Sequence, residues 1–408
     1  MPGKLKPEVG SQRSDAHCSR FPTSDFRLQT SFQYLPSMKR IWYNILLLAL
    51  PAMTYAQTEH YLLIGTYTKG KSEGIYVYKF NSETGDISPV SKVAASNPSY
   101  LAVSPDEKFV YAVNEGGDDK GSVSAFSFDK NTGTLKYIDK QPSGGDHPCY
   151  VAVNKTGKWV AVANYTGGSF STLPVMANGT LGVPTTIQHT GSSVNKERQD
   201  KPHVHSTVFS PDDKYLFVQD LGIDKITIYS FNPGSGKPEP APVPFVATTP
   251  GTGPRHFTFH PNGKYAYLIE EMGGQIEAYK YNNGKLTHIQ TISSLPDTFT
   301  GKKWAADIHI SPDGKFLYAS NRTPSNTVGA FKIDNKTGRL TAIGFESVKG
   351  DVPRNFTIDP SGNFLLVANQ ETDNVVIFKR NKETGLLTDT GKQIQVGNPV
   401  CLKWADVK

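Results

Sequence analysis

The sequence predicts an all-β protein, a seven-bladed β-propeller with four-stranded blades, and two repeated phrases are the basis for this prediction. The first phrase is an apolar run, a Ser-Pro-Asp turn and a second apolar run, as in residues 98–114. Its copies begin at Pro98, Pro148, Val204, Pro254, Ala305, Pro353 and Pro399. The second phrase is a turn ending in glycine, at Gly85, Gly133, Gly179, Gly236, Gly284, Gly338 and Gly385. A period of about 50 residues made of short strands is typical of radially repeated sheets.

Each repeat is predicted to supply four antiparallel strands in order. In the first full repeat we expect them at 101–103, 109–113, 122–128 and 134–139. Pro105 and Asp106 favour a tight turn between the first two strands, and Gly133 favours one between the last two. The strands near the axis carry Val, Ile, Phe and Ala on both faces, as expected where neighbouring blades cover a sheet on both sides.

The two ends of the chain are predicted to build the seventh blade together. Residues 399–404 have the pattern of an innermost strand with nothing after it. Residues 61–67 and 74–80 look like second and third strands that lack a first strand before them. We therefore expect the N- and C-terminal strands to pair and close the ring, which removes open sheet edges. The polar segment 188–202 is interpreted as a loop over one face.

Residues 1–56 lack the pattern of a folded domain. Met38-Lys39-Arg40, an apolar run from Ile41 to Leu50 and small residues up to Ala56 are typical of a secretory signal peptide. The apolar run is too short to span a bilayer stably. We expect 1–37 to be a mis-assigned upstream extension, 38–56 to be the signal peptide, and 57–408 to be a single propeller domain. The protein is then exported, periplasmic or extracellular, with no stable membrane insertion.

Charge and cysteine content narrow the possible partners. Residues 1–56 hold seven of the 43 Lys and Arg residues and three of the 37 acidic ones, so the remainder has a net charge of only +2. That balance does not favour a nucleic-acid partner, which needs clustered basic residues. Cys149 and Cys401 lie in different repeats, so no disulfide is expected between them.

Alignment of the repeats with one another separates structural positions from candidate functional ones. The start of each innermost strand and the end of the second strand lie at one mouth of the channel, here called the strand-start mouth; the Ser-Pro-Asp turns lie at the other, the turn mouth. The second strand ends on a near-uniform polar residue with an expected structural role, at Asn114, Asn164, Asp220, Glu270, Asn321 and Asn369. The next residue varies: Glu115, Tyr165, Leu221, Glu271, Arg322 and Gln370.

Charged residues are concentrated at the strand-start mouth of blades three to six. The strand-start positions are Ser99, Cys149, His205, Arg255, Ala306, Arg354 and Val400. The residues expected to gather in one sector are His203, His205, Arg255, His256, Glu271, Asp307, His309, Arg322 and Arg354. Any one of them is accounted for by a structural ion pair or a backbone hydrogen bond. Several buried cations with few carboxylates are costly as a group, however, and this predicts a pocket for a carboxylate, a phosphate or a developing oxyanion.

With these residues identified, the sequence resembles the propeller lactonase family, which includes bacterial propeller-type 6-phosphogluconolactonases and fungal 3-carboxy-cis,cis-muconate lactonizing enzymes. The resemblance covers essentially all of residues 60–404. Its most specific stretches are Lys201-Pro202-His203-Val204-His205 with Ser210-Pro211-Asp212, Gly253-Pro254-Arg255-His256-Phe257, residues 306–314 with Ser320-Asn321-Arg322, and Val162-Ala163-Asn164-Tyr165.

The resemblance implies a site carried by a histidine, an arginine and a glutamate. These fall on the catalytic candidates His203 or His205, Arg255 and Glu271. The substrate-binding candidates are His256, Asp307, His309, Arg322, Arg354, Asn164 and Tyr165. Asp307 stands where the family often has a glutamate before the Ile-His-Ile run, so its role has the least support.

Opening a lactone with water requires a base and a group that stabilises the carbonyl oxygen as it gains charge. Glu271 and the two histidines are the candidate bases, and Arg255 is the candidate for holding the oxyanion or a substrate carboxylate. Arg322 and Arg354 would bind a more distant acidic group.

The spacing of His203 and His205 also permits a metal site. The expected site contains no metal or cofactor, because further ligands would be needed and the family does not generally rely on a metal.

The expected function is hydrolysis of a sugar or organic-acid lactone, resembling 6-phosphogluconolactonase, by a monomer that acts on an anionic small molecule. Export would separate the protein from cytosolic 6-phosphogluconolactone, which leaves other lactones open as substrates. The alternative is a non-catalytic exported propeller that binds a glycan, a peptide or a protein at the same mouth.

Overall fold

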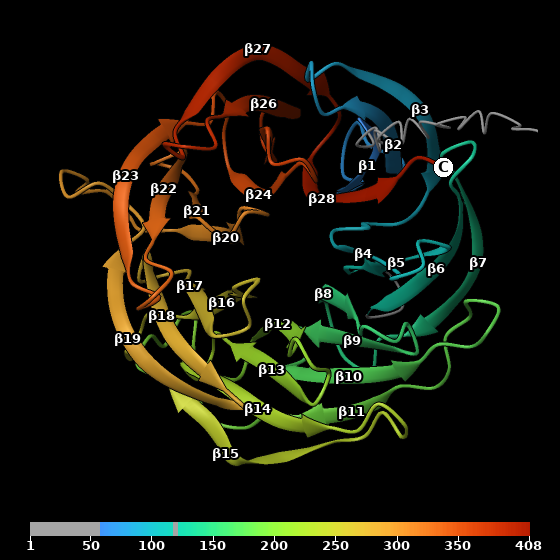
Figure 1. The fold of residues 1–408 in the computed structure, drawn as a ribbon. Helices are drawn as coiled ribbons and strands as arrows, with labels where there is room; N and C mark the ends of the chain where they lie inside the picture. The colour runs from blue at the N-terminus through green and yellow to red at the C-terminus, as the bar shows by residue number, and fades with distance from the viewer. Residues whose placement is uncertain (1–57, 117–120) are drawn as a thin grey trace, which may run out of the picture. The chain divides into compact units, whose positions relative to one another are not determined.

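The computed structural model describes residues 58–116 and 121–408, which belong to one compact unit. Every regular element in these residues is a β-strand. The strands form seven four-stranded antiparallel sheets set as blades around a central axis (Figure 1). The predicted seven-bladed propeller is therefore confirmed. The expected extension 1–37 and signal peptide 38–56 lie outside the described residues.

The blades are numbered in chain order by their innermost strands. Blade 1 contains β4 (Leu101–Val103), β5 (Phe109–Asn114), β6 (Ser122–Asp129) and β7 (Thr134–Pro142). Blade 2 contains β8 (Pro148–Val153), β9 (Trp159–Asn164), β10 (Ser169–Pro174) and β11 (Thr185–Gln188), and blade 3 contains β12 (Val204–Phe209), β13 (Tyr215–Asp220), β14 (Lys225–Phe231) and β15 (Pro238–Ala247).

The second half of the ring continues the same order. Blade 4 contains β16 (Pro254–Phe259), β17 (Tyr265–Glu270), β18 (Gln275–Asn282) and β19 (Lys285–Ser293), and blade 5 contains β20 (Ala305–Ile310), β21 (Phe316–Asn321), β22 (Thr327–Ile333) and β23 (Leu340–Ser347). Blade 6 contains β24 (Pro353–Ile358), β25 (Phe364–Asn369), β26 (Asn374–Arg380) and β27 (Leu387–Gln395).

Blade 7 is built from both ends of the described chain, as expected. It contains β28 (Pro399–Asp406), β1 (Glu59–Thr66), β2 (Gly74–Asn81) and β3 (Ile87–Ala94), in that order from the axis. β28 pairs antiparallel with β1, from Asp406 opposite His60 to Pro399 opposite Thr66. Figure 1 shows the red β28 beside the blue β1. This pairing closes the ring.

The apolar core is divided among the interfaces between blades. Leu62 and Ile64 of β1 pack toward blade 6, whereas Tyr61 and Leu63 of the same strand pack toward blade 1. Successive side chains of a strand point to opposite faces, so a strand that is apolar on both faces connects two neighbouring interfaces.

The glycine of the second repeated phrase has a steric role. Gly236 has φ of +67°, and a Cβ added there would lie 2.2 Å from the Trp159 ring of the preceding blade. Gly179 has φ of +84°, and its added Cβ would lie 2.2 Å from Phe109. The turn thus packs against an aromatic ring of the neighbouring blade at a distance and a backbone conformation that favour glycine.

A β-bulge interrupts the start of most innermost strands. In β12 the pairing with β13 skips from Val204 to Ser206, and in β16 the pairing with β17 skips from Pro254 to His256. The unpaired residues are therefore His205 and Arg255. Corresponding skips leave Cys149, Arg354 and Val400 unpaired, and β20 leaves both Ala306 and Asp307 unpaired. Bulges re-aim side chains, and here they occur at the strand-start positions.

Two further observations bear on the sequence predictions. Cys149 and Cys401 are buried free thiols. Among residues 58–116 and 121–408, no helix is long and apolar enough to cross a membrane.

Candidate functional site

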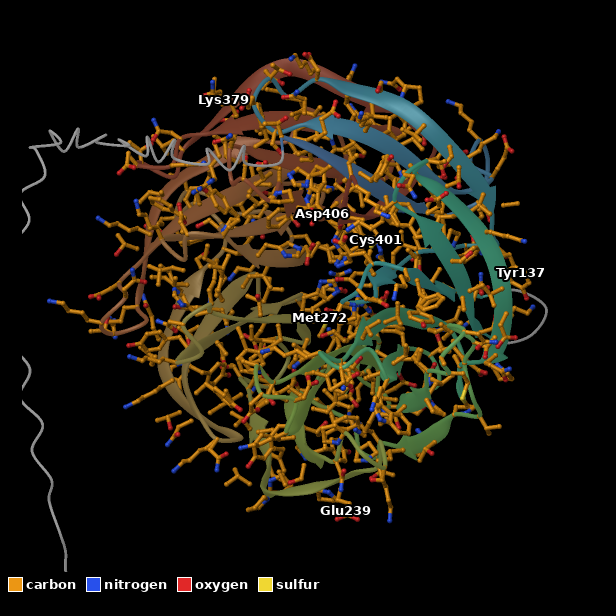
Figure 2. The ribbon with its side chains drawn as sticks, turned by 45° about the vertical axis from the view of Figure 1, so that its right-hand side comes forward. Tyr137, Glu239, Met272, Lys379, Cys401 and Asp406 are labelled. Atoms are coloured by element: carbon orange, nitrogen blue, oxygen red, sulfur yellow. The ribbon has the colours of Figure 1, made fainter. Side chains whose placement is uncertain are left out.

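A single carboxylate, that of Glu271, gathers three arginines near the axis. Its Oε2 atom lies 3.0 Å from Nε of Arg255 and 2.8 Å from Nη2 of Arg322. Its Oε1 atom lies 2.6 Å from Nη2 of Arg198 and accepts a 3.3 Å hydrogen bond from the Trp304 indole. We call Glu271, Arg198, Arg255, Arg322 and His205 the Glu271 cluster. Figure 2 shows Met272, the residue after Glu271, close to the centre of the ring, whereas Tyr137, Glu239 and Lys379 lie toward its outer rim.

Backbone carbonyls of β20 fix two of these arginines. Arg255 donates from Nη1 to the Ala306 carbonyl, and Arg322 donates from Nη2 to the Ala305 carbonyl at 2.9 Å. The Arg322 guanidinium also lies over the Trp304 ring, 4.2 Å from its centre. Both side chains are buried. Arg255 and Arg322 are therefore rigid donors whose positions depend on blade 5.

The charges of the cluster follow from this arrangement. Burial alone would raise the pKa of Glu271, but Arg322, Arg255, His205 and Arg198 together hold that pKa well below its usual range. Burial lowers the pKa of Arg322 to about 9, with Glu271 opposing the shift. At neutral pH Glu271 is thus a carboxylate and Arg322 is a cation. A carboxylate held so firmly is a weak base.

The two candidate histidines occupy different environments. Burial, followed by the charge of Arg255, lowers the pKa of His205 well below its ordinary value, so its imidazole is neutral at pH 7. Its Nε2 atom lies 3.9 Å from Oε2 of Glu271. His203 instead stacks on Tyr165, with Nδ1 3.1 Å from the Tyr165 carbonyl oxygen and Nε2 3.5 Å from the Asp200 carboxylate. Of the two, only His205 has a ring nitrogen directed at the cluster.

Asp307 and His309 do not join the Glu271 cluster, which corrects the expectation that all the charged candidates share one mouth. Asp307 accepts hydrogen bonds from His256 at 2.7 Å, from His309 at 2.9 Å and from the Asn355 amide. His256, Asp307 and His309 line a cavity of about 400 Å³, and Ser210 and Pro211 of a turn line it too.

The reason is the length of the strand. A β-strand advances about 3.3 Å per residue, so His309 lies further from the strand-start mouth than Ala306 does. The cavity belongs to the turn mouth. His256 connects the two regions, because its Nε2 atom is 3.3 Å from Nη1 of Arg255. Burial and the charge of Arg255 lower the pKa of His256 to about 3, so its ring is neutral.

Arg354 lies over Tyr67, which lines a second cavity, at the strand-start mouth. Its guanidinium lies 5.5 Å from the centre of the Tyr67 ring. The Tyr67 hydroxyl donates to Glu115 at 2.8 Å, and both residues line a cavity of about 570 Å³ with Lys69 and His147. Arg354 also interacts electrostatically with Glu271, Arg255 and Arg322. It therefore lies between the Glu271 cluster and this mouth cavity.

Asn164 is not placed to bind a substrate, contrary to its inclusion among the candidates. Its side chain is fully buried, and its amide donates to the Ser143 carbonyl at 3.3 Å and to Ser169 at 3.1 Å. This is the structural role expected for the polar residue that ends a second strand. Tyr165, the next residue, is partly exposed beside His203 and Arg198 and stays a candidate for binding substrate.

Two members of the site were missed in the sequence. Trp304 directly precedes its strand start, as His203 and Gly253 do in blades 3 and 4, so comparison of the blades at that position was the signal that could have found it. Arg198 belongs to the loop 188–202, which has no counterpart in the other blades, so comparison of blades could not identify it. Only the unusual length of the loop set it apart in the sequence.

No group of three or more His, Cys, Asp or Glu side chains in the described ranges is arranged to hold a metal ion. Arg255 and Arg322 both contact Oε2 of Glu271, and their guanidinium groups are instead suited to binding an anion. The metal-free site stays a prediction.

Comparisons with known proteins agree over most of the chain. The family described as "Lactonase, 7-bladed beta-propeller" matches residues 61–404. A protein of Formosa agariphila named 6-phosphogluconolactonase is 41% identical over 351 residues, which cover 84% of this chain and 98% of that protein. A protein of Bacillus subtilis with the same name is 38% identical over 355 residues, or 85% and 99% of the two chains. The solved structure of the periplasmic gluconolactonase of Pseudomonas aeruginosa is 38% identical, with a TM-score of 0.82 over 86% of this chain and all of that one.

Proposed function

Because this chain belongs to the seven-bladed β-propeller lactonase family and is a lactone-hydrolysing enzyme, we propose that the Glu271 cluster binds and opens an anionic sugar lactone. The relatives named above suggest 6-phosphogluconolactone or gluconolactone as the substrate. The mouth cavity of about 570 Å³ is large enough for a molecule of this size, and Arg354 lies between it and the Glu271 cluster, whose own members do not line it.

The observation that carries the proposal is the excess of positive charge at the strand-start mouth. Arg198, Arg255, Arg322 and Arg354 interact there with the carboxylates of Glu271 and Glu115. Four guanidinium groups thus face two carboxylates at this mouth, and Asp307, which also acts on Arg255, is a third carboxylate nearby. Buried cations without matching anions are costly, and a bound anion offsets that cost.

In the proposed reaction, Arg255 and Arg322 bind the lactone carbonyl and stabilise the oxyanion that forms when water attacks. Both are fixed in advance by Glu271 and by the Ala305 and Ala306 carbonyls, so little reorganisation is needed in the transition state. Glu271 serves as the anchor of the two arginines, and both of its oxygens are already engaged by arginines and by the Trp304 indole, which leaves the role of base to another residue.

His205 is the proposed general base. Its neutral imidazole accepts a proton from the attacking water as the oxygen–carbon bond forms, and the nearby Glu271 carboxylate stabilises the resulting imidazolium. The bond between the carbonyl carbon and the ring oxygen then breaks. The proton passes to the departing alkoxide, and the product is a hydroxy acid that ionises at neutral pH.

The test is hydrolysis of a lactone panel followed with a pH indicator. The wild type should release protons from δ-gluconolactone or its 6-phosphate faster than the spontaneous reaction does. Arg255→Ala and Glu271→Gln should each lower kcat/KM by about 100-fold or more, the range expected when oxyanion binding or its support is lost.

Arg339→Ala is the matched control, because Arg339 is an exposed arginine on an outer turn. Arg255→Lys provides a second variant that keeps the charge and loses the planar fork. If both cluster variants are folded by circular dichroism and fully active, the assignment of the site is wrong.

We further propose that the enzyme is exported as a monomer. Residues 38–56 have the sequence pattern of a signal peptide, and one relative is named a periplasmic gluconolactonase. Intact mass spectrometry of the protein from a secreting host should give a mature chain that begins near Gln57, and light scattering should give the mass of one chain. Retention of residues 38–56 would contradict export by this signal.

A further inference from the structure

Arg198 is held differently from the other two arginines bound to Glu271. Arg255 and Arg322 are buried and each donates to a backbone carbonyl of β20. The Arg198 side chain is 36% exposed, and the contacts of its guanidinium are with side chains, Oε1 of Glu271 at 2.6 Å and the Tyr165 hydroxyl at 3.1 Å. It therefore covers the solvent side of the cluster and can leave without breaking a backbone hydrogen bond.

The loop that carries Arg198 is anchored on both sides of it. The backbone N–H of Arg198 donates to Oδ1 of Asn195 at 3.2 Å. The neighbouring Gln199 is fully buried and donates from Nε2 to the Leu221 carbonyl at 2.8 Å. Ser193 donates to the Asp224 carboxylate at 2.5 Å. The backbone is thus fixed, and rotation of the Arg198 side chain is the movement that remains available.

Glu271 does not depend on Arg198 for neutralisation. Without it, Oε2 still contacts Arg255 and Arg322, and Oε1 still accepts from Trp304. The exchange of Arg198 from Glu271 to another anion therefore leaves no unpaired buried charge, which is the large cost in breaking a buried ion pair.

We propose that Arg198 is a specificity-determining residue that leaves Glu271 to bind the acidic substituent of the substrate, a phosphate or a carboxylate outside the reacting ring. This inference rests on the proposed lactonase site. Arg255 and Arg322 hold the carbonyl at the inner end of the cluster, while Arg198 lies at the outer end, where the substituent of a bound lactone would be. The planar guanidinium binds phosphate and carboxylate through paired hydrogen bonds.

A neutral lactone offers Arg198 no replacement for Glu271, so the arginine continues to cover the cluster. An anionic lactone draws it away and is held by it. Discrimination between the two substrates then depends on Arg198, because specificity is a difference between two transition-state binding energies.

The experiment compares kcat and KM for 6-phosphogluconolactone and δ-gluconolactone, which differ by one phosphate. The variants are Arg198→Ala, Arg198→Lys and the control Lys196→Ala. Lys196 lies in the same loop and carries the same charge, but its ammonium group contacts the Ser193 carbonyl. We expect Arg198→Ala to lower the ratio of kcat/KM for the phosphorylated lactone to that for the neutral one by about tenfold to a hundredfold, mainly through KM, as for a lost hydrogen bond between charged groups.

Arg198→Lys should retain part of the ratio, and Lys196→Ala should retain all of it. Equal loss on both lactones would show that Arg198 only supports the loop, and an unchanged ratio would show that it does not meet the substituent. Either result overturns the inference, as would a wild type that does not prefer the phosphorylated lactone. If the proposed lactonase site itself is wrong, Arg255→Ala will be fully active, and this result distinguishes that failure from a failure of the Arg198 inference.

Discussion

At the scale of single residues, two adjacent carboxyl groups are held in opposite charge states by their surroundings. The arginines keep Glu271 ionised. Glu270 is fully buried without a cation, and burial, followed by the charge of Glu277, raises its pKa to about 8. The Thr252 hydroxyl lies 2.6 Å from Oε1 of Glu270 and 2.5 Å from the Thr249 carbonyl oxygen, and its single proton can be donated to only one of the two at a time.

This environment makes the contribution of Glu270 to stability depend on pH. Its pKa is higher in the folded state than the ordinary value of 4.5. The folded state therefore binds more protons than the unfolded state between these values, and stability falls as the pH rises from about 4.5 through about 8. Glu270→Gln removes this dependence, since its amide oxygen can accept from Thr252 and the side chain does not ionise. The measured quantity is the melting temperature of Glu270→Gln minus that of the wild type, from thermal unfolding. We expect this difference to be larger at pH 9 than at pH 5 by about 2 °C or more.

Glu83→Gln is the control, because Glu83 lies on an exposed turn and its replacement removes the same charge. Its melting temperature should follow that of the wild type at each pH. A difference between Glu270→Gln and the wild type that is constant from pH 5 to pH 9 would contradict a protonated Glu270.

Reasoning from the sequence identified most of the cluster but not its outermost member. Arg255, Glu271, Arg322 and His205 could be found because each breaks the pattern of its repeat at a position that faces the channel. Arg198 could not be found in this way, since it lies in a loop without counterparts. The sequence also left the base open, and only the directions of the ring nitrogens distinguish His205 from His203.

At the scale of elements, the bulges explain why the strand-start positions carry the charges. A residue in a regular ladder uses its N–H and C=O groups for pairing, and its side chain stands perpendicular to the sheet. The bulge frees His205 and Arg255 from pairing with the second strand and increases the local bend. Because the bulge recurs in several blades, side chains from neighbouring blades meet near the axis.

The positions of the strands were predictable because the same sequence pattern recurs in each repeat. The recurring glycines mark turns that pack against Phe109, Trp159 and equivalent rings of neighbouring blades, so their spacing follows from a contact that every blade makes. The position of a residue between the two mouths of the channel was harder to predict from the sequence. Asp307 and His309 were assigned to the strand-start mouth, although the two residues line the cavity at the turn mouth, because each residue along a strand lies about 3.3 Å further from its start.

At the scale of the whole molecule, the ring is held by interfaces that each blade shares with two neighbours. β28 contributes to two of them, since Cys401 and Ala405 pack toward blade 1 and Leu402 packs toward blade 6. Asn355 of blade 6 accepts a 2.7 Å hydrogen bond from the backbone N–H of Leu402. Closure therefore connects the first and last blades through side chains as well as through the β28–β1 ladder.

Deletion of residues 399–408 is expected to unfold the protein as a whole. The deletion exposes the inner edge of β1, from His60 to Thr66, and removes apolar side chains from both flanking interfaces. An open, apolar strand edge invites aggregation, and a lost core side chain costs about 2–5 kcal/mol on its own. The losses of several such residues together are comparable to the 5–15 kcal/mol of a typical domain. The variant should lack a cooperative thermal transition and bind a hydrophobic dye.

A truncation after Asp406 separates closure from chain length. It keeps every residue of the β28–β1 ladder, including the 3.1 Å contact between Nδ1 of His60 and Oδ1 of Asp406. This shorter chain should melt cooperatively, because the two flanking interfaces retain Cys401, Leu402 and Ala405. Leu402→Ala should fall between the two truncations, with a lower melting temperature but a cooperative transition. If the chain that lacks 399–408 melts cooperatively at the temperature of the wild type, the ring does not depend on its closure, and six blades are sufficient to hold the Glu271 cluster together.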